Sequence, residues 1–166
     1  MRLSTKGRYA VMAMVDLAGR GAGRPISLAE IATRQEISLS YLEQLFAHLR
    51  RSGLVSSVRG PGGGYKLAHA ANQTRIADII LAVDEPLQAT RCKLGSPRGC
   101  TSTGSRCQTH DLWEELGNHI HVFLNSVTLE DVCQRRVLGG RGRDRWDQAA
   151  GGRAAEPAPR AVAAAE

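Results

Sequence analysis

The hydrophobic positions of the first third of the chain repeat with the period of an α-helix. Apolar side chains recur every three or four residues over 5–19, 28–35 and 41–52, which predicts three helices. A capping box, Ser27 with Glu30, precedes the second helix, and Ser40 with Glu43 gives the same pattern for the third. Two short helices joined by a tight turn predict a helix-turn-helix, although any small helical hairpin shows this pattern. The predicted core residues of its second helix are Leu42, Leu45, Phe46 and Leu49.

A β-hairpin is predicted directly after the third helix. Residues 54–58 alternate like a strand, the glycine-rich stretch 59–64 predicts a turn, and residues 65–67 predict the returning strand. A hairpin at this place is the wing of a winged helix-turn-helix, and Arg59 at its tip suits the narrow minor groove of DNA. A phosphate-binding loop is the alternative, but no Lys-Ser/Thr pair and no helix follow the glycines. The sequence therefore predicts a mostly α fold with a small β wing.

The second half of the chain predicts helices on both sides of a loop. A helix over 75–84, capped by Thr74, precedes a loop over 86–108 that is rich in Gly, Ser, Thr and Pro. A longer helix, capped by Thr109, has a continuous apolar face that is expected to pack against a second copy of the chain; an ordinary core helix is the alternative. Thr128 caps a last short helix. The apolar face comprises Leu112, Leu116, Ile120, Phe123 and Val127.

These patterns divide the chain into four segments. Residues 1–85 form the predicted winged helix-turn-helix, 86–110 the loop with the candidate ligands, and 111–136 the dimerisation helix and a C-terminal helix. After about residue 137 the chain turns to Gly, Arg, Ala and Pro without periodicity, which predicts a disordered tail over 137–166.

Positive charge is concentrated in the winged-helix part of the chain. The 166 residues have a net charge of +6, and 42% of them are hydrophobic, which is typical of a globular protein. Residues 1–66 hold 10 Lys and Arg against 4 Asp and Glu, whereas residues 67–133 hold 5 against 8. The basic third favours double-stranded DNA as the partner. No apolar run is long enough to span a membrane and the N-terminus lacks a signal-peptide core, so a cytoplasmic protein is expected.

Three cysteines and one histidine lie close together in the sequence: Cys92, Cys100, Cys107 and His110. A disulfide framework is not expected in a cytosolic chain, where thiols stay reduced, so this Cys/His group indicates metal or redox chemistry. Three thiolates and an imidazole suit zinc as well as an iron–sulfur cluster, and the spacing alone does not distinguish the two. Cys133 stands apart and is interpreted as a small buried apolar residue.

Several stretches of sequence carry a resemblance to a known family. They are the opening MRLSTKGRYA, the segment ISLSYLEQLF at 37–46, GLVSSVRGPGGGY at 53–65, and the three-cysteine loop with the helix after it. Over about residues 1–133 the chain resembles the iron–sulfur cluster regulators of the Rrf family of winged-helix transcription factors. The resemblance implies a homodimeric regulator, mainly a repressor of iron–sulfur cluster assembly genes, which carries a 2Fe-2S cluster donated by an assembly scaffold. The implied cluster ligands are Cys92, Cys100, Cys107 and His110.

The candidate DNA-contacting residues lie on the first helix, the recognition helix and the wing. Serine hydroxyls and the Gln44 amide can read base edges, and Glu43 can accept from a cytosine amine or simply complete the capping box. Polar and basic residues of the first helix, together with Arg50, suit phosphates, which position a protein without specifying sequence. The full set is Ser4, Lys6, Arg8, Tyr9, Ser38, Ser40, Tyr41, Glu43, Gln44, Arg50, Arg59 and Gly60.

Three other functions share parts of this pattern. Nitric oxide sensors of the same family use an acidic residue near the N-terminus as the fourth cluster ligand, where this chain has Arg8. A structural zinc-binding DNA module would use the same Cys/His group. A redox enzyme or electron carrier is not favoured, because the chain has no catalytic triad and no dinucleotide-binding fingerprint. We therefore expect a regulator and not an enzyme.

Overall fold

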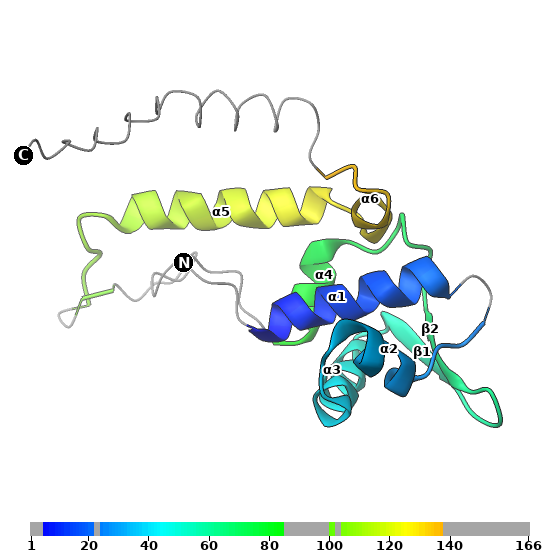
Figure 1. Cartoon of the computed structure of the whole chain (residues 1–166). Coiled ribbons are helices and arrows are strands. Elements are labelled where there is room, and N and C mark those ends of the chain that lie inside the picture. The colour runs from blue at the N-terminus through cyan, green and yellow to red at the C-terminus, as the bar shows by residue number, and fades with distance from the viewer. Residues whose placement is uncertain (1–4, 22–23, 85–99, 102–103, 138–166) are drawn as a thin grey trace, which may run out of the picture. The chain divides into compact units, whose positions relative to one another are not determined.

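The computed structural model describes residues 5–21, 24–84, 100–101 and 104–137 (Figure 1). Within them the chain is mostly helical with one antiparallel pair of strands, which confirms the predicted fold class. Most of the predicted loop and the tail from residue 138 onwards lie outside the described residues. None of the described helices is long and apolar enough to cross a membrane. The elements are α1 (Thr5–Arg20), α2 (Leu28–Gln35), α3 (Leu39–Arg51), β1 (Val55–Val58), β2 (Gly64–Leu67), α4 (Ile76–Ala82), α5 (His110–Ser126) and α6 (Leu129–Cys133).

Helices α2 and α3 form the predicted helix-turn-helix. The Ser27 hydroxyl accepts from the Glu30 N–H, and the Ser27 N–H donates to the Glu30 carboxylate at 2.9 Å, which confirms the first capping box. Glu36, with a left-handed φ of 54°, makes the turn after α2. The two helices pack against each other directly after this turn.

Helix α3 begins two residues earlier than the sequence pattern predicts. Its N-cap is Ser38, whose hydroxyl accepts from the Tyr41 N–H at 3.4 Å, and Ser40 lies inside the first turn. The predicted Ser40–Glu43 capping box is therefore wrong, because Ser38 has the extended backbone that a cap requires. Glu43 is exposed instead of capping the helix.

Gly53 turns the chain from α3 into the wing. Its φ is 73°, and the Leu54 N–H that follows reaches back to the Leu49 carbonyl at 3.0 Å, a Schellman motif. Strands β1 and β2 then pair in antiparallel register, with Val58 opposite Gly64. The glycine-rich turn between them is the tip of the wing.

The wing is fastened to the segment before α2. The N–H and C=O groups of Ile26 bond the C=O and N–H groups of Tyr65 at 2.9 and 2.8 Å. A side chain at Gly64 would collide with the Ile26 backbone, so this close approach requires glycine. Because Ile26 directly precedes the cap of α2, the backbone couples the wing to the helix-turn-helix.

The hydrophobic core lies between α1, α3 and α4. The four predicted core residues of α3 are all buried, and the Phe46 ring packs edge-on against Tyr65 of the wing with 4.9 Å between centroids. Small and aliphatic side chains from the other two helices close the core. They are Ala10, Ala13, Met14, Leu17, Ile76, Ile79, Ile80 and Val83.

Helix α4 begins without the cap that the sequence predicts. The Thr74 hydroxyl is buried and donates to the Ala70 carbonyl at 3.2 Å, so it is not available to the helix. Arg75 occupies the cap position and makes no side-chain cap hydrogen bond. The prediction of Thr74 as a cap is therefore wrong, since this hydroxyl is used by the preceding turn.

Main-chain hydrogen bonds join the start of α4 to the chain that follows α5. The Ile76 N–H donates to the Val127 carbonyl at 3.0 Å, and the Leu129 N–H donates to the Thr74 carbonyl at 2.8 Å. The next helix, α6, has the predicted Thr128 cap, completed by Asp131 in a capping box. This junction attaches α5 and α6 to the winged helix.

A buried ion pair joins α1 to α2. Arg34 donates to both carboxylate oxygens of Asp16, at 2.6 Å in the shortest contact, and Gln35 adds a hydrogen bond of 2.7 Å. Only 6% of Asp16 is exposed. Burial by itself raises the pKa of Asp16, but the hydrogen bonds from Arg34 and Gln35 and the charge of Arg34 outweigh it, so the pKa lies below its ordinary value.

Arg34→Ala is expected to destabilise the protein by about 3 kcal/mol at neutral pH, because it leaves the Asp16 carboxylate buried without its partner. With a lowered folded pKa, the pair stabilises the fold fully above the unfolded pKa of about 3.9. This contribution is lost as the pH falls through the folded pKa. The difference between wild type and variant is thus expected to shrink below about pH 4, as measured by urea unfolding.

Arg24→Ala is the matched control for this experiment. Arg24 pairs with Glu30 at 3.4 Å, but 63% of its side chain is exposed, so its removal is expected to change stability much less. Equal losses for the two variants would contradict the structural role of the buried pair.

Candidate metal centre and DNA-binding surface

Three of the four predicted cluster ligands lie together in the structure. The Sγ atoms of Cys100 and Cys107 and a ring nitrogen of His110 lie within 4.8 Å of one another. Cys92, the fourth predicted ligand, is outside the described residues. Sulfur and imidazole donors in such a group suit zinc or an iron–sulfur cluster.

A turn closed by its own hydrogen bonds brings the two cysteines together. The Thr101 hydroxyl accepts from the Ser105 N–H at 3.0 Å, and the Thr101 carbonyl accepts from Gly104, whose φ of 80° favours glycine. The Cys107 N–H then points at the Sγ atom of Cys100, 3.0 Å away. An N–H group in this position stabilises the thiolate, which is the form that binds metal.

His110 joins the group from the first turn of α5. The backbone N–H of His110 donates to the Cys107 carbonyl at 3.0 Å, and the ring Nδ1 lies 3.5 Å from the Sγ of Cys100. The residue is only 2% exposed, and its Nε2 is buried without a hydrogen bond. The Glu114 carboxylate lies 3.4 Å from Nε2, longer than an ordinary hydrogen bond but close enough to orient the ring. One nitrogen facing a thiol and the other a carboxylate is typical of a metal-binding histidine.

Thr109 precedes α5 but does not cap it with its side chain, contrary to the prediction. Its backbone is not extended (φ −103°, ψ 13°), so the hydroxyl does not reach the free N–H groups of the helix. The hydroxyl instead accepts from the Trp113 indole N–H at 3.2 Å and lies 3.7 Å from the Sγ of Cys107. Thr109 therefore connects the ligand turn to the first turn of α5.

Cys133 lies apart from the Cys/His group. Its thiol is half-buried and donates to the Val15 carbonyl of α1 at 3.9 Å. Burial raises the pKa of the Cys133 thiol, which keeps it protonated and makes it a poor metal ligand. Its surroundings fit a residue used for packing.

The start of α3 presents most of the predicted base-reading residues to solvent. Tyr41 is half-buried, because its ring packs edge-on against Tyr9 of α1 with 6.0 Å between centroids. This contact places the start of α1, which carries Lys6 and Arg8, beside the start of α3. The exposed predicted residues of α3 and its cap are Ser38, Ser40, Glu43, Gln44 and Arg50.

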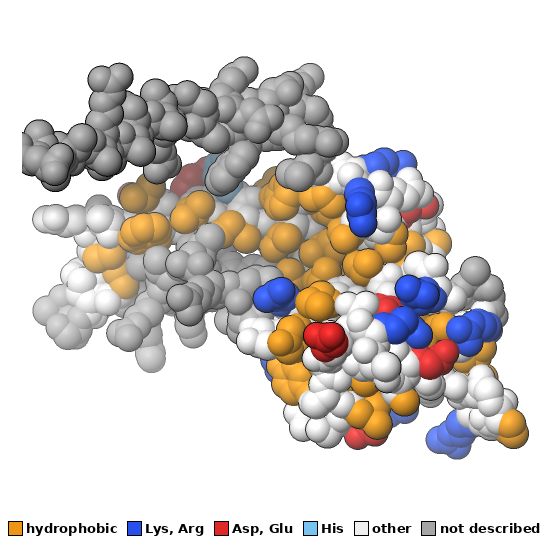
Figure 2. All heavy atoms as spheres, viewed as in Figure 1, with side chains coloured by type: hydrophobic (Ala, Val, Ile, Leu, Met, Phe, Trp, Pro, Cys, Tyr) orange, Lys and Arg blue, Asp and Glu red, His pale blue; other side chains and the backbone are white. Residues whose placement is uncertain are grey.

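The wing tip and the first helix supply the other predicted DNA contacts. Arg59 and Gly60 are exposed at the tip, where Gly60 has a φ of 106°. Arg8 is exposed on α1 and Lys6 is half-buried, whereas Ser4 lies outside the described residues. Figure 2 shows Lys and Arg side chains interspersed with Asp and Glu over the winged-helix part and near α6, and hydrophobic side chains along α5.

The apolar face of α5 is only partly covered within the chain. Leu112 is 63% exposed and Phe123 is 53% exposed, and Val122 beside them is 66% exposed. Val127, the last residue of the predicted face, is buried at the junction with α4. Leu112 and Phe123 of this face are therefore available to another molecule, Leu116 and Ile120 are half-buried, and Val127 belongs to the core of the chain itself.

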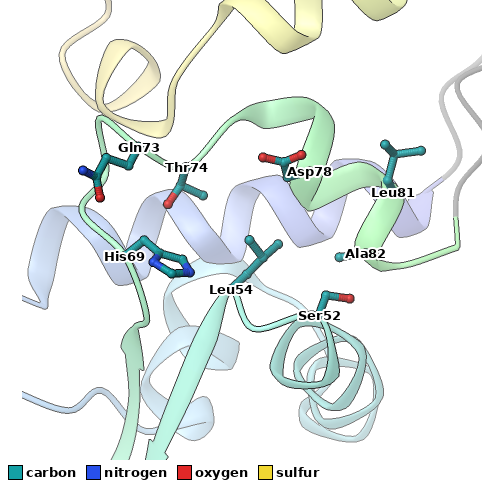
Figure 3. A pocket seen from close by; sticks show the side chains of 8 residues that line it. All are labelled: Ser52, Leu54, His69, Gln73, Thr74, Asp78, Leu81 and Ala82. Atoms are coloured by element: carbon teal, nitrogen blue, oxygen red, sulfur yellow. The ribbon is translucent and has the colours of Figure 1, made fainter.

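A cavity of about 600 Å³ lies beside α4, near the end of α3 and the start of β1 (Figure 3). Its lining mixes polar side chains such as His69 and Asp78 with the apolar Leu81. Thr74 is a buried polar residue of this lining, but its hydroxyl donates to the Ala70 carbonyl and so already has a hydrogen-bond partner. Among the described residues, the one buried side-chain polar atom without a hydrogen bond is His110 Nε2, which favours the Cys/His group as the functional site.

Comparison with known proteins identifies the family of this chain. The model of the Rrf2 family, described as "Iron-dependent Transcriptional regulator", matches residues 3–135. The chain belongs to the Rrf2 family. Its members are transcriptional regulators and not enzymes, so the winged helix described above is the DNA-binding part of a regulator.

Individual relatives agree with this assignment. The HTH-type transcriptional regulator IscR of Photorhabdus laumondii is 52% identical over 159 residues, which cover 94% of this chain and 95% of the relative. The protein of the same name from Escherichia coli O1:K1 is 52% identical over 144 residues, 86% of this chain and 87% of the relative. These similarities confirm the resemblance that the sequence motifs indicate.

Solved structures share the fold. T. potens IscR superposes with a TM-score of 0.66 at 38% identity, over 82% of this chain and 88% of that chain. CymR, the global cysteine regulator of B. subtilis, superposes with a TM-score of 0.67 at 32% identity, over 81% and 98%. Both confirm a winged-helix regulator fold.

Cys100→Ser and Cys107→Ser are each expected to lower the metal retained per chain by about tenfold or more, since each removes a thiolate from the group. Glu114→Gln is expected to weaken retention by about tenfold, because the carboxylate orients His110. Metal content after anaerobic purification and chelator challenge measures both effects. Cys133→Ser is the matched control, and a loss of metal from this variant equal to that from Cys100→Ser would contradict the assignment.

Proposed function

We propose that this regulator binds DNA in a manner that depends on a 2Fe-2S cluster held by Cys92, Cys100, Cys107 and His110. The convergence of Cys100, Cys107 and His110 within 4.8 Å carries the proposal. These residues supply three of the four ligands that a two-iron cluster needs, and Cys92 lies in the same loop of the sequence. In the loaded state the protein represses genes for iron–sulfur cluster assembly, and in the unloaded state it binds a second class of sites.

The donor set suits zinc as well as an iron–sulfur cluster, and the family supports the cluster. The family model is described as iron-dependent, and sulfur ligands with one imidazole are suitable for iron. When bound, such a cluster supplies a redox-active, exchangeable group, which suits a sensor. The chain holds the ligands in place: the turn after Cys100 positions the sulfurs, and Glu114 orients the His110 ring.

Packed helices connect the ligand group to the recognition helix. His110 is the first residue of α5, α5 packs on α4, and α4 packs on α3. At the end of α4, the Asp84 carboxylate lies 3.0 Å from Nδ1 of His48 on α3. A change in how the ligands are held can thus bias the position of α3, which allosteric coupling between the two sites requires.

A homodimer formed through α5 completes the proposal. The exposed side chains of Leu112 and Phe123, with Val122 next to Phe123, are apolar groups on α5 that a second copy of the helix can cover. Two copies present two recognition helices, which match the two half-sites of a double-stranded operator. The winged-helix, ligand-loop and dimerisation segments of the sequence then each have a separate role.

The proposed setting is the cytoplasm, where thiols stay reduced and a cluster-assembly scaffold can donate the cluster.

The visible spectrum and metal content of anaerobically purified protein distinguish the alternatives. A two-iron spectrum supports the proposal, a four-iron spectrum favours a nitric oxide sensor, and colourless zinc-loaded protein favours a structural DNA-binding module.

Removing the cluster ligands is expected to change which promoters the protein protects. The variant carrying Cys92→Ala, Cys100→Ala and Cys107→Ala is compared with wild type by footprinting on a panel of promoters under anaerobic conditions. We expect the variant to lose one class of sites, because the loaded arrangement of the helices is no longer stabilised. Cys133→Ala is expected to protect the same promoter sites as wild type. Identical site preferences for wild type and the triple variant would contradict the proposal.

Phe123→Glu is expected to convert the protein to single chains of 17.9 kDa, because it places a charge in the proposed apolar interface. Sedimentation equilibrium of wild type and variant measures the mass. Leu81→Glu, at a position 46% exposed on α4, is the matched control and is expected to retain the wild-type mass. A wild-type protein that sediments as a single chain would contradict the homodimer.

A further inference from the structure

Helix α3 exposes one large apolar side chain at its DNA-reading end. Leu39 is the first residue of the helix and is 43% exposed. The other leucines of α3, Leu42, Leu45 and Leu49, are at most 1% exposed. An exposed leucine forgoes the free energy of burial, which makes a contact with a ligand on this surface favourable.

The neighbours of Leu39 are the residues expected to read bases. It lies between Ser38 and Ser40, and about 40° around the helix axis from Glu43, one turn further along. All three of these neighbours are exposed. Because N-terminal residues of a recognition helix reach the base edges, Leu39 shares the polar residues' access to the major groove. Its side chain has no hydrogen-bonding group, so its contact with DNA is apolar.

We propose that Leu39 is a specificity-determining residue that packs against the 5-methyl group of thymine in the major groove. This methyl is the apolar group of the major-groove edge, and among the four bases only thymine carries it. An isobutyl side chain can cover the methyl and exclude water without leaving a polar group unpaired. Glu43, one turn away, suits the amine of cytosine, so the two side chains together distinguish the two pyrimidines. The inference rests on DNA binding by the winged helix and is independent of the cluster.

Replacing thymine by uracil removes this methyl group and leaves base pairing unchanged. Duplexes enriched from a random-sequence pool by the full-length protein serve as probes, and each thymine of a half-site is replaced in turn. Wild-type affinity is expected to fall about fourfold at one or two positions, the effect of losing one buried methyl group. Leu39→Ala is expected to bind the thymine duplex more weakly by a similar factor and to be insensitive to uracil at those positions.

Leu81→Ala is the matched control, since Leu81 is an exposed leucine on α4. It is expected to keep the wild-type sensitivity to uracil, and thermal unfolding followed by circular dichroism establishes that both variants are folded. Wild-type binding that is insensitive at every thymine, or equal sensitivity in Leu39→Ala, overturns the inference while DNA binding stands. Failure of the protein to enrich any duplex overturns DNA binding itself, and the inference with it.

Discussion

The bidentate pairing of Arg34 with Asp16 determines how the helix-turn-helix sits on the rest of the protein. Helix α1 packs against α2, α3, α4, α6 and β2, so almost every element is placed relative to it. Removing the Asp16 carboxylate of α1 from water costs several kcal/mol, and a cation that pairs with it in good geometry offsets this cost. Arg34 and Gln35 satisfy that demand from α2, and a displaced α2 would lose all of these hydrogen bonds together. The apolar core allows some sliding of helices, whereas this polar contact defines one position.

The second organising feature is the main-chain junction between the start of α4 and the end of α5. Backbone hydrogen bonds from Ile76 and Leu129 tie these segments together without side-chain specificity. One end of α5 is therefore anchored in the winged helix, while His110 at its other end belongs to the Cys/His group. The same helix carries the exposed apolar side chains of Leu112, Val122 and Phe123. In the proposed function, the ligand group and the self-association surface both lie on α5, and α4 connects α5 to the recognition helix α3.

The sequence predicted elements whose signals are local and missed contacts that depend on the fold. Helical periods, the Ser27 and Thr128 caps and the glycine-rich wing depend on residues within a few positions of one another, and all are found. Ser40, Thr74 and Thr109 were wrong as caps because a hydroxyl before an apolar run is common, and the backbone conformation decides whether it caps. The Cys/His spacing indicates the ligands, but Glu114, whose carboxylate orients the His110 ring, belongs to no recognisable sequence motif. A leucine in a helical pattern is normally interpreted as core, so the pattern alone does not distinguish the exposed Leu39 from the buried leucines of α3.

The backbone pairing of Ile26 with Tyr65 has a consequence for how DNA is sensed. Two backbone hydrogen bonds join the wing to the segment that leads into the helix-turn-helix, and Gly64 is the residue whose lack of a side chain permits that pairing. With α3 expected in the major groove and the wing tip in the adjacent minor groove, affinity is expected to depend on the distance between the two grooves. Base pairs that the protein never touches then influence affinity through helical twist and groove width. We therefore expect the protein to recognise DNA by indirect readout of its shape as well as by direct readout of its bases.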